Sequence, residues 1–278
     1  MAAQTVPLRR TAHPSPKSGF WPRPNERVVF GLLGFLIVLG TWELVSSSEY
    51  GLGLVKRVLL SSPTLILDAA IKDISSGAIW PHIVESGKEY AFGFSAALVT
   101  GIPLGLAIGW FRRLNYVLDP WLSAIYATPT VALIPLIILI FGIDLGAKIV
   151  VVWLEAIFVI TVSTTTGVRA ADAKYHDIAE SFRASKWTVF RTVTLPASVP
   201  YILTGVRLGT GRALVGVVVS EFLAANAGIG FYISLNGSFF SSARVFFGII
   251  LLGVLGITLG ELVRVVEKRF DRWRPAIS

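Results

Sequence analysis

The chain of 278 residues contains no cysteine and only three histidines, at the distant positions 13, 82 and 176. Without thiols it can form neither a disulfide framework nor a thiolate metal site, and the scattered histidines form no local metal cluster. Charged residues are also few, at 15%, whereas 54% of the residues are hydrophobic. A mean hydropathy of +0.69 is too high for a soluble domain. We therefore expect the lipid bilayer to be its solvent.

Long apolar segments are the main feature of the sequence. A transmembrane helix needs about 20 mostly apolar residues to cross roughly 30 Å of hydrocarbon, because its backbone groups must find partners within the segment. Six stretches meet this requirement: 28–46, 90–111, 119–142, 148–167, 199–223 and 245–265. We expect an all-α, polytopic membrane protein in which residues 27–270 form a six-helix transmembrane bundle.

The first apolar stretch could alternatively be a cleaved signal peptide. It is long, contains Glu43 and is followed by no small-x-small cleavage site. These features favour an uncleaved first span.

Basic residues are distributed unequally between the loops. Seventeen Lys and Arg lie before the first span, after the second, between the fourth and fifth, or after the sixth, and only six lie in the other loops. By the positive-inside rule, both termini and the loop 168–198 are expected in the cytoplasm. The net charge of +8 thus indicates orientation rather than nucleic-acid binding. We expect residues 1–26, rich in proline and arginine, to form a disordered cytoplasmic tail and residues 271–278 to form a second tail.

Two local patterns predict how the bundle packs. The second span carries a small residue at every fourth position, which lines one helical face and predicts a close helix–helix seam: Gly93, Ala97, Gly101, Gly105 and Gly109. In the external connection 47–89, Pro63 precedes a segment whose apolar residues recur at helical spacing. This spacing predicts an interfacial amphipathic helix.

The loop between the fourth and fifth spans is unusually rich in aromatic residues. Residues 175–201 combine helical spacing with Phe182, Trp187 and Phe190, and Pro196 and Pro200 are expected to end the helix before the next span. Two short helices with an apolar face and a basic rim would suit a helix-in-groove contact with a soluble partner.

This loop matches the pattern of a known family at the same spacing. Residues 177–179 stand where the pattern has Glu-Ala-Ala, Arg183 stands at its glycine, and residues 193–196 stand at its closing Ile-x-Leu-Pro. The chain thereby resembles the inner-membrane permeases of binding-protein-dependent ABC importers. Further matches extend over nearly residues 60–270 and resemble the nitrate, sulfonate, taurine and bicarbonate branch: Ser62-Pro63, 101–105, 118–120, 127–129, 135–137, 141–143, 204–209, Glu221-Phe222 and 228–230. The main departure is Arg183, because a glycine would let two short helices turn sharply.

The resemblance implies a division of labour within the membrane of a prokaryotic cell. Two permease copies, expected as a homodimer, would form the pathway, cytoplasmic ABC ATPase subunits would bind them, and an extracytoplasmic solute-binding protein would deliver the solute. The chain has no Gly-x-x-x-x-Gly-Lys-[Ser/Thr] motif, so it is expected to be no enzyme and to bind no cofactor, with ATP and Mg²⁺ used by the partner. Its ATPase-coupling positions would be Asp177, Ala179, Arg183, Ala184, Ser185, Leu195 and Pro196.

Four charged residues fall within predicted spans: Glu155, Arg207, Arg212 and Glu221. Each would cost about 2.5–3.5 kcal/mol facing lipid at the bilayer centre, so each should face protein or water. Arg212 and Glu221 lie on opposite sides of one helix and cannot pair. Glu155 and Arg212 differ in depth by only about 6 Å, at roughly 1.5 Å per residue, which a long arginine side chain can cover. We therefore expect a Glu155–Arg212 contact between spans.

Two roles remain open for these intramembrane charges. They lock the bundle, or Arg207 or Arg212 lines the pathway and favours anionic solutes. Span hydroxyls are further candidates for solute contact, although such groups more often bond to their own helix backbone: Thr130, Ser163, Thr164 and Thr165.

Other functions are possible for a chain of this kind. An ion-gradient-driven secondary transporter or channel would use Glu155 and Glu221 as proton or ion sites, but six spans without an obvious inverted repeat disfavour it. A membrane-embedded enzyme lacks support, because the sequence has no nucleophile elbow, metal motif or acid–base cluster.

Overall fold

A computed structural model describes residues 24–46, 60–170, 182–223 and 225–270, and every regular element in these ranges is helical. The chain forms two compact units, Met1–Leu54 and Val55–Ser278, and each is described by itself. Predictions for the tail residues 1–23 and 271–278, and for Asp177 and Ala179, lie outside the described residues.

The first unit contributes one described helix, α1 (Pro24–Ser46). Its window Val28–Ser46 is long and apolar enough to cross a membrane, and its apolar side chains are largely exposed. The first predicted span is therefore a helix, and it begins at Pro24, inside the segment 1–26 that was expected to be a disordered tail.

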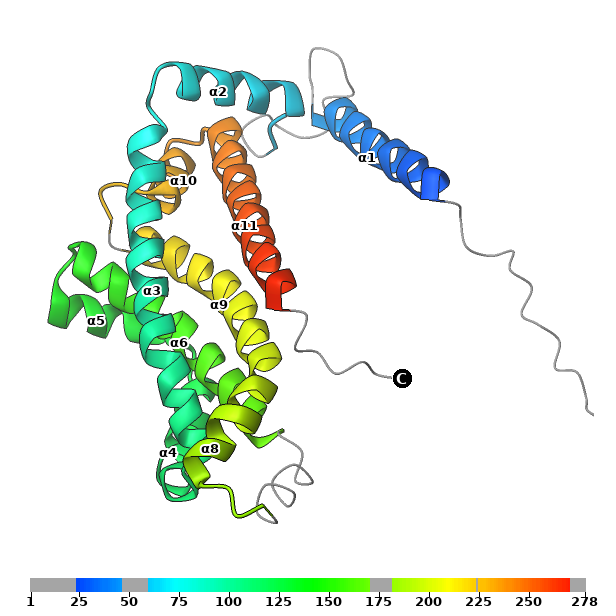
Figure 1. Ribbon diagram of the computed structural model, residues 1–278. Coiled ribbons are helices and arrows are strands. Elements are labelled where there is room, and N and C mark those ends of the chain that lie inside the picture. The colour runs from blue at the N-terminus through cyan, green and yellow to red at the C-terminus, as the bar shows by residue number, and fades with distance from the viewer. Residues whose placement is uncertain (1–23, 47–59, 171–181, 224, 271–278) are drawn as a thin grey trace, which may run out of the picture. The chain divides into compact units, whose positions relative to one another are not determined.

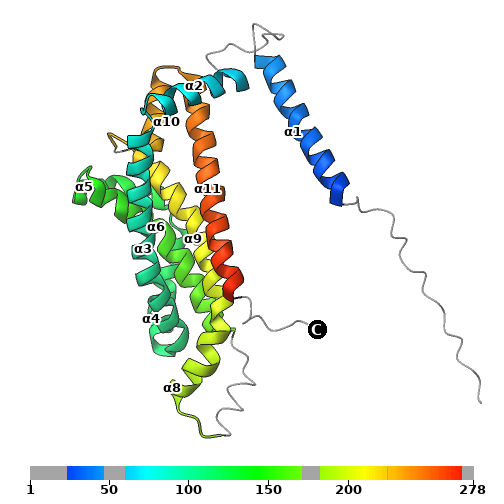
Figure 2. The same ribbon diagram turned by 45° about the horizontal axis from the view of Figure 1, so that its top comes forward.

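In the second unit, α2 (Pro63–Ser75) begins at the predicted proline and is capped by the Ser62 hydroxyl, which accepts from the Leu65 backbone N–H at 3.5 Å. Figure 1 and Figure 2 show α2 lying across one end of the bundle. Its buried side chains are Ile66 and Asp73, whereas Leu67 is exposed. Leu67 is one of the apolar residues whose helical spacing predicts this helix, so part of the apolar face of α2 is exposed.

Three long helices form the centre of the bundle: α3 (Trp80–Trp110), α6 (Leu145–Arg169) and α9 (Leu195–Leu223). α6 lies between the other two and packs most extensively against both (Figure 1, Figure 2). Their shared core consists of small and β-branched residues: Ala97, Val152, Ala156, Ile157, Ile160, Ala213 and Val217.

The predicted glycine seam is the α3–α6 contact. A Cβ at Gly93 would lie 2.5 Å from the Val152 Cβ, and one at Gly109 would lie 2.5 Å from the Val168 Cβ. Any larger side chain on this face would force the two helices apart, so the stripe is structural.

The third predicted span, 119–142, is wrong as a single helix. The chain forms α4 (Arg112–Ala127), a 3₁₀ turn (Thr130–Leu133) and the short helix α5 (Ile134–Phe141). The break falls at Thr128, which is extended, before Pro129, as expected for a residue that precedes a proline. Among the described residues, five helices are long and apolar enough to span a membrane, and Thr130–Phe141 is a shorter apolar segment.

The helix before the fifth span does not end at its prolines, contrary to the prediction. It begins with α8 (Lys186–Val189), continues through a π-helical turn (Phe190–Thr194) and runs directly into α9. The wider π turn changes the hydrogen-bonding register just before Pro196, where a proline would otherwise leave a carbonyl unpaired. Pro200 is tolerated inside α9.

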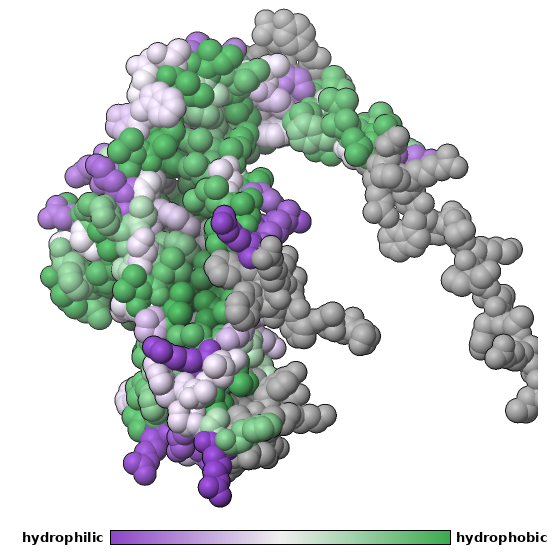
Figure 3. All heavy atoms as spheres, viewed as in Figure 1, coloured by the Kyte–Doolittle hydropathy of each residue, from purple (hydrophilic) through white to green (hydrophobic). Residues whose placement is uncertain are grey.

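Two further helices complete the unit: α10 (Ile229–Ser238) and α11 (Ser242–Phe270). In Figure 3, green apolar side chains cover much of the face between the two ends of the bundle, and purple side chains gather at its lower end, where α4 and α8 lie. A wide apolar band between polar ends is the surface expected of a protein embedded in lipid.

Candidate functional site

The predicted contact between Glu155 and Arg212 is present. Arg212 Nη2 of α9 lies 3.3 Å from Glu155 Oε2 of α6, and the Glu155 side chain is 4% exposed whereas that of Arg212 is 51% exposed. The Thr130 hydroxyl, from the 3₁₀ turn after α4, donates to the other Glu155 oxygen. One buried carboxylate therefore ties the interrupted segment, α6 and α9 together.

Arg207 forms a separate ion pair. Its Nη1 lies 3.5 Å from Glu267 Oε2 of α11, so it joins α9 to α11 rather than joining the Glu155 cluster. Both arginines are thus partly neutralised while about half of each side chain remains exposed.

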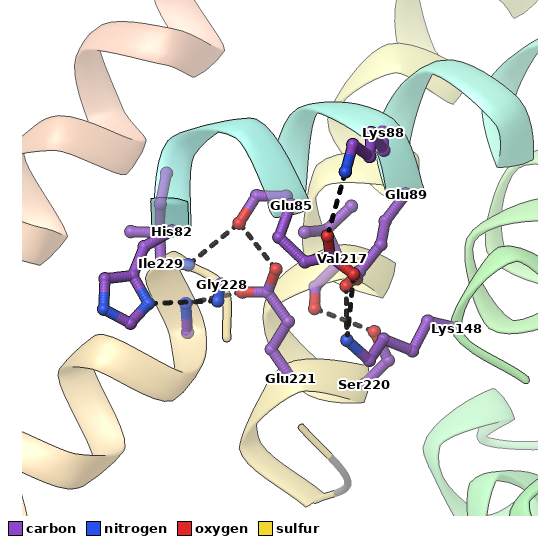
Figure 4. A network of polar contacts seen from close by, with 12 residues as sticks. His82, Glu85, Lys88, Glu89, Lys148, Val217, Ser220, Glu221, Gly228 and Ile229 are labelled. Carbon is purple, nitrogen blue, oxygen red and sulfur yellow. Dashed lines mark hydrogen bonds and ion pairs between the residues drawn. The ribbon is translucent and has the colours of Figure 1, made fainter. Parts of the chain in front are cut away.

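Glu221 is buried at the other end of α9 and holds the start of α10. Figure 4 shows its carboxylate close to Gly228. The Ser86 hydroxyl donates to Oε1 at 2.5 Å, and the Gly230 N–H donates to Oε2 at 2.6 Å. Ser86 in turn accepts from the Ile229 N–H at 2.8 Å. A carboxylate at a helix N-terminus satisfies free N–H groups and complements the helix dipole, so Glu221 has a capping role.

Gly228 makes this close approach of the chain to Glu221 possible. Its φ of 123° lies in a region that side chains rarely adopt, and a Cβ there would overlap the Glu221 carboxylate. Its N–H donates to Nδ1 of His82 at 3.1 Å. His82 is thereby used to hold the α9–α10 connection.

A second buried ion pair was not predicted from the sequence. Lys148 Nζ of α6 donates to Glu89 Oε1 of α3 at 2.7 Å and lies 3.8 Å from Glu85 Oε1 (Figure 4). Lys148 is one of the six basic residues that the sequence assigns to the other loops, yet it is buried. The available signal was the one-turn spacing of Glu85 and Glu89, which places two carboxylates on one helical face.

The α2 end of the bundle carries another buried carboxylate, that of Asp73. Asp73 accepts a hydrogen bond from the Tyr232 hydroxyl at 2.5 Å and two from the Arg244 guanidinium at 2.9 and 3.2 Å. Burial raises the pKa of Tyr232, and the hydrogen bond to Asp73 raises it further. The cluster fixes α2 to α10 and α11.

The hydroxyls within α6 serve helix packing. Thr165 donates across to the Gly105 carbonyl of α3 at 3.1 Å, and Ser163 faces Gly205 of α9. Thr164 is fully buried against Gly105. Ser163, Thr164 and Thr165 therefore lie at contacts of α6 with α3 and α9.

At the α8 end, Arg183 adopts the conformation of the glycine that it replaces in the motif. Its φ is 51°, in the left-handed region. Two residues later, the Ser185 hydroxyl accepts from the Thr188 N–H at 3.2 Å and caps α8, with Ala184 between them. Leu195 and Pro196 begin α9. Arg183 therefore departs from the motif in residue type but takes a backbone conformation that suits the motif's glycine.

Aromatic side chains connect α8 to the end of α3. The Trp110 ring packs edge-on against Phe190, with centroids 5.0 Å apart, and Phe190 stacks on Trp187 at 5.5 Å. The Arg191 guanidinium lies 4.4 Å from the centroid of the Trp187 ring. Movement of the segment after residue 182 would therefore be transmitted to α3 as well as to α9.

Long apolar helices joined by buried ion pairs indicate a multi-pass membrane protein. Residues 101–272 match the family described as the binding-protein-dependent transport system inner membrane component, so the chain belongs to this family. It is accordingly a permease of the ABC importer class, and its relatives in that class imply an ABC ATPase and a binding protein as partners.

Relatives with different named solutes are similar over most of their length. The chain is 33% identical over 244 residues to the aliphatic sulfonates transport permease SsuC of Bacillus subtilis, covering 88% of this chain and 87% of that protein. It is 31% identical over 239 residues to the nitrate import permease NrtB of Leptolyngbya laminosa, covering 85% of each. It is 30% identical over 242 residues to the formylaminopyrimidine transport permease ThiX of Halalkalibacterium halodurans, covering 87% and 94%.

The fold is also similar to that of a solved transporter chain. A chain of the inward-facing MetNI methionine ABC transporter aligns with a TM-score of 0.59 at 16% identity, covering 70% of this chain and 98% of that one. The likeness supports the helical architecture described above.

Proposed function

We propose that this chain, paired with a second copy, forms the transmembrane pathway of an ATP-driven importer for a small anionic solute of the sulfonate, taurine, nitrate or bicarbonate kind. A partner ATPase uses ATP and Mg²⁺, and an external binding protein delivers the solute. The chain itself binds no cofactor. The observation that carries the anion assignment is the half-exposed guanidinium of Arg212 at membrane depth.

Arg212 lies on an exposed stripe of α9. Leu208 and Val215, one turn to either side, are also exposed, so this face of α9 has no cover within the described part of the chain. An arginine on such a face cannot be left against lipid without a large cost, and it would instead face water or a second polypeptide. The ion pair with Glu155 engages Nη2 of Arg212, and the N–H groups of the guanidinium suit a planar or tetrahedral oxyanion.

The interrupted segment supports the same location. Helices that break at membrane depth commonly contribute to solute sites, because their free backbone groups are directed toward a polar cavity. Thr130 at the break and Arg212 converge on the same carboxylate of Glu155. A movement of the segment 130–141 would therefore alter the surroundings of Arg212.

Residues 182–196 are the proposed contact with the ATPase, on the cytoplasmic side. Phe182 and Trp187 are exposed and would fill a groove in a partner. The direct continuation of α8 into α9 supports coupling, since displacement of α8 would move the helix that carries Arg212. In this proposal both termini are cytoplasmic and the α2 end receives the binding protein.

The anion assignment is tested in proteoliposomes that contain the chain with its ATPase and binding protein. ATP-dependent uptake of taurine, an alkyl sulfonate, nitrate and bicarbonate is compared with uptake of formylaminopyrimidine, which carries no charge. Arg212→Gln should lower anion uptake about tenfold, as expected from loss of a charged hydrogen bond, and Arg212→Lys should retain part of it. Arg264→Gln, which removes an exposed arginine paired with Glu261, is the control. Unchanged uptake by assembled Arg212→Gln complexes would remove Arg212 from the pathway.

The energy source is tested separately. Deleting residues 175–191 should abolish co-purification of the ATPase in detergent. In the intact complex, ATP-dependent uptake should persist when a protonophore collapses the proton gradient. Uptake that needs no ATP but collapses with the gradient would instead support the secondary-transporter alternative.

A further inference from the structure

The start of α10 is held by side-chain acceptors, and one of them is a histidine. The consecutive N–H groups of residues 228–230 donate, in order, to His82 Nδ1 at 3.1 Å, to the Ser86 hydroxyl at 2.8 Å and to Glu221 Oε2 at 2.6 Å. Histidine is the side chain that ordinarily changes charge between about pH 5 and about pH 8. We propose that His82 is an acid-sensitive latch, which holds the α9–α10 connection to α3 when neutral and releases it when protonated.

The hydrogen bond fixes the protonation state in which this latch is closed. Nδ1 of His82 accepts from the Gly228 N–H, so this nitrogen carries no proton, and the neutral ring carries its proton on Nε2. A second proton would have to be added at Nδ1, and both ring nitrogens would then be donors. Two N–H groups facing each other form no hydrogen bond. The contact is therefore present above the range in which histidine titrates and is lost as the pH falls through it.

Burial makes the loss of this acceptor consequential. Gly228 and Ile229 are buried, whereas His82 is only partly buried, so water can deliver a proton to the ring. A buried N–H that loses its acceptor is left without a hydrogen bond, which is destabilising. Because glycine adopts positive and negative φ with similar ease, the chain can change direction at Gly228 once this N–H is released.

Glu221 is the carboxylate that favours opening of the latch in acid. It lies against Gly228, the residue that His82 holds (Figure 4). A positive charge on His82 would be attracted toward this carboxylate. Acid therefore removes the hydrogen bond to Gly228 and at the same time gives the ring a different electrostatic partner.

The other titratable and charged groups around His82 already have partners. On α3 itself, Glu85 forms ion pairs with Lys88 and Lys148. The ring of Tyr232 lies 5.5 Å from that of His82, and its hydroxyl donates to Asp73 of α2. Asp73 is also bound by Arg244 of α11. Protonation of His82 is thus the change in this surrounding that directly breaks the contact with Gly228.

A histidine is not needed merely to satisfy the Gly228 N–H. Ser86, one turn further along α3, accepts from the Ile229 N–H through a hydroxyl, which stays neutral at these pH values. An asparagine at position 82 would likewise offer an oxygen in the place of Nδ1. The imidazole therefore adds a dependence on pH that the backbone contact alone does not require.

The latch acts on the helix that carries the proposed solute contact. Glu221 and Arg212 both belong to α9, so release of the α9–α10 connection changes how this helix is anchored to α3. That the latch faces the external medium rests on the proposed function. The measurement below does not depend on it.

The test uses the full-length chain in detergent, without ATPase, binding protein or solute. Hydrogen exchange of the amides of residues 228–230 is compared at about pH 7.5 and about pH 5, on either side of the ordinary histidine titration, after correction for the intrinsic effect of pH on exchange. Protection in the parent should fall at least about tenfold in acid, as expected when a buried donor loses its acceptor. Residues 151–157 of α6 are the internal reference and should keep their protection.

Two substitutions imitate the closed and the open latch. His82→Asn keeps an acceptor that does not titrate, so residues 228–230 should stay protected at both pH values. His82→Phe keeps a ring without an acceptor, so their protection should be low at both. The double variant His13→Asn, His176→Asn changes the other two histidines of the chain, and as the matched control it should respond to acid like the parent.

Two results would overturn the proposal. If protection falls in acid to the same extent in His82→Asn, the response belongs to another group, such as the Glu221 carboxylate. If protection in the parent does not change, His82 either stays neutral or holds nothing that acid can release. Because no transport component other than this chain is present, either result would leave the proposed importer function standing.

Discussion

Lys148 of α6 and Glu89 of α3 form an ion pair at 2.7 Å, and both side chains are buried. The pair joins two of the three central helices near the network that caps α10 (Figure 4). Because a buried charge is tolerated only with its partner, the two residues stabilise the bundle as a unit rather than independently.

Removing one member of this pair should be more harmful than removing both. Lys148→Met leaves the fully buried Glu89 carboxylate without its cation and should cost about 3–5 kcal/mol, which corresponds to a fall in Tm of roughly 10 °C. The double variant Lys148→Met, Glu89→Gln should recover most of that loss. Thermal unfolding of the full-length chain in detergent measures both.

Lys88→Met is the matched control, because Lys88 forms an exposed pair with Glu85 at 3.5 Å one turn away. It should change Tm by little, as exposed pairs contribute less than about 1 kcal/mol. A double variant no more stable than Lys148→Met alone would refute the coupling.

The glycine seam predicts a contrast between two positions on α3. A Cβ at Gly105 would lie 2.6 Å from the Thr164 Cβ and 2.7 Å from the Thr161 carbonyl oxygen, so Gly105→Ala should destabilise by about 1–3 kcal/mol. Gly87 has open space around it, and Gly87→Ala should be neutral or stabilising by up to about 1 kcal/mol. Equal melting temperatures for the two variants would contradict the α3–α6 packing.

Alanine substitution at two glycines with positive φ distinguishes the cost of backbone strain from the cost of steric overlap. Gly228→Ala would combine an unfavourable φ of 123° with a Cβ inside the Glu221 carboxylate, and should release the start of α10. Gly77→Ala, at φ 82°, meets no neighbour and should cost only about 1–2 kcal/mol. Hydrogen exchange of residues 229–238 checks this: protection should fall in Gly228→Ala and persist in Gly77→Ala.

The left-handed turn at Arg183 predicts opposite effects of two substitutions. Arg183→Gly suits the φ of 51° and should preserve retention of the ATPase. Arg183→Val removes the same charge but places a β-branched residue where it is strongly disfavoured, and should reduce ATPase retention several-fold, since roughly 1–2 kcal/mol of strain opposes the turn. If both variants retain the ATPase equally, the turn is not part of the contact.

Hydropathy located most of the spans. It failed at residues 119–142, which do not form one continuous helix, and this failure has a physical cause. Residues 119–142 are mostly apolar, but hydropathy does not register that Pro129 removes an N–H and forces the preceding residue out of the helix. The opposite error occurred at Pro196, which follows a π turn, and at Pro200, which lies inside α9, because the helix continues through both. Proline positions alone do not distinguish these two outcomes.

The sequence predicted the ion pair whose two charges lie deep in the membrane, because few oppositely charged residues are available at that depth. Glu155 and Arg212 both lie well inside spans at similar depth, so their contact followed from the cost of leaving either charge in lipid. Glu89 and Lys148 were missed because charged residues were used to mark the ends of spans. A neutralised pair can lie inside the helices, and only the three-dimensional arrangement shows that these two meet.

The interruption between α4 and α5 also constrains where the membrane itself can lie. Thr128 is extended and Pro129 has no N–H, so the end of α4 loses donors that a continuous helix would supply. Thr128 replaces two of them: its hydroxyl donates to the Ala124 carbonyl at 2.9 Å, and its N–H donates to the Ile125 carbonyl at 3.0 Å. Because acyl chains cannot hydrate a bare carbonyl, an apolar side chain at position 128 would make this flank tolerable only beside water or another polypeptide.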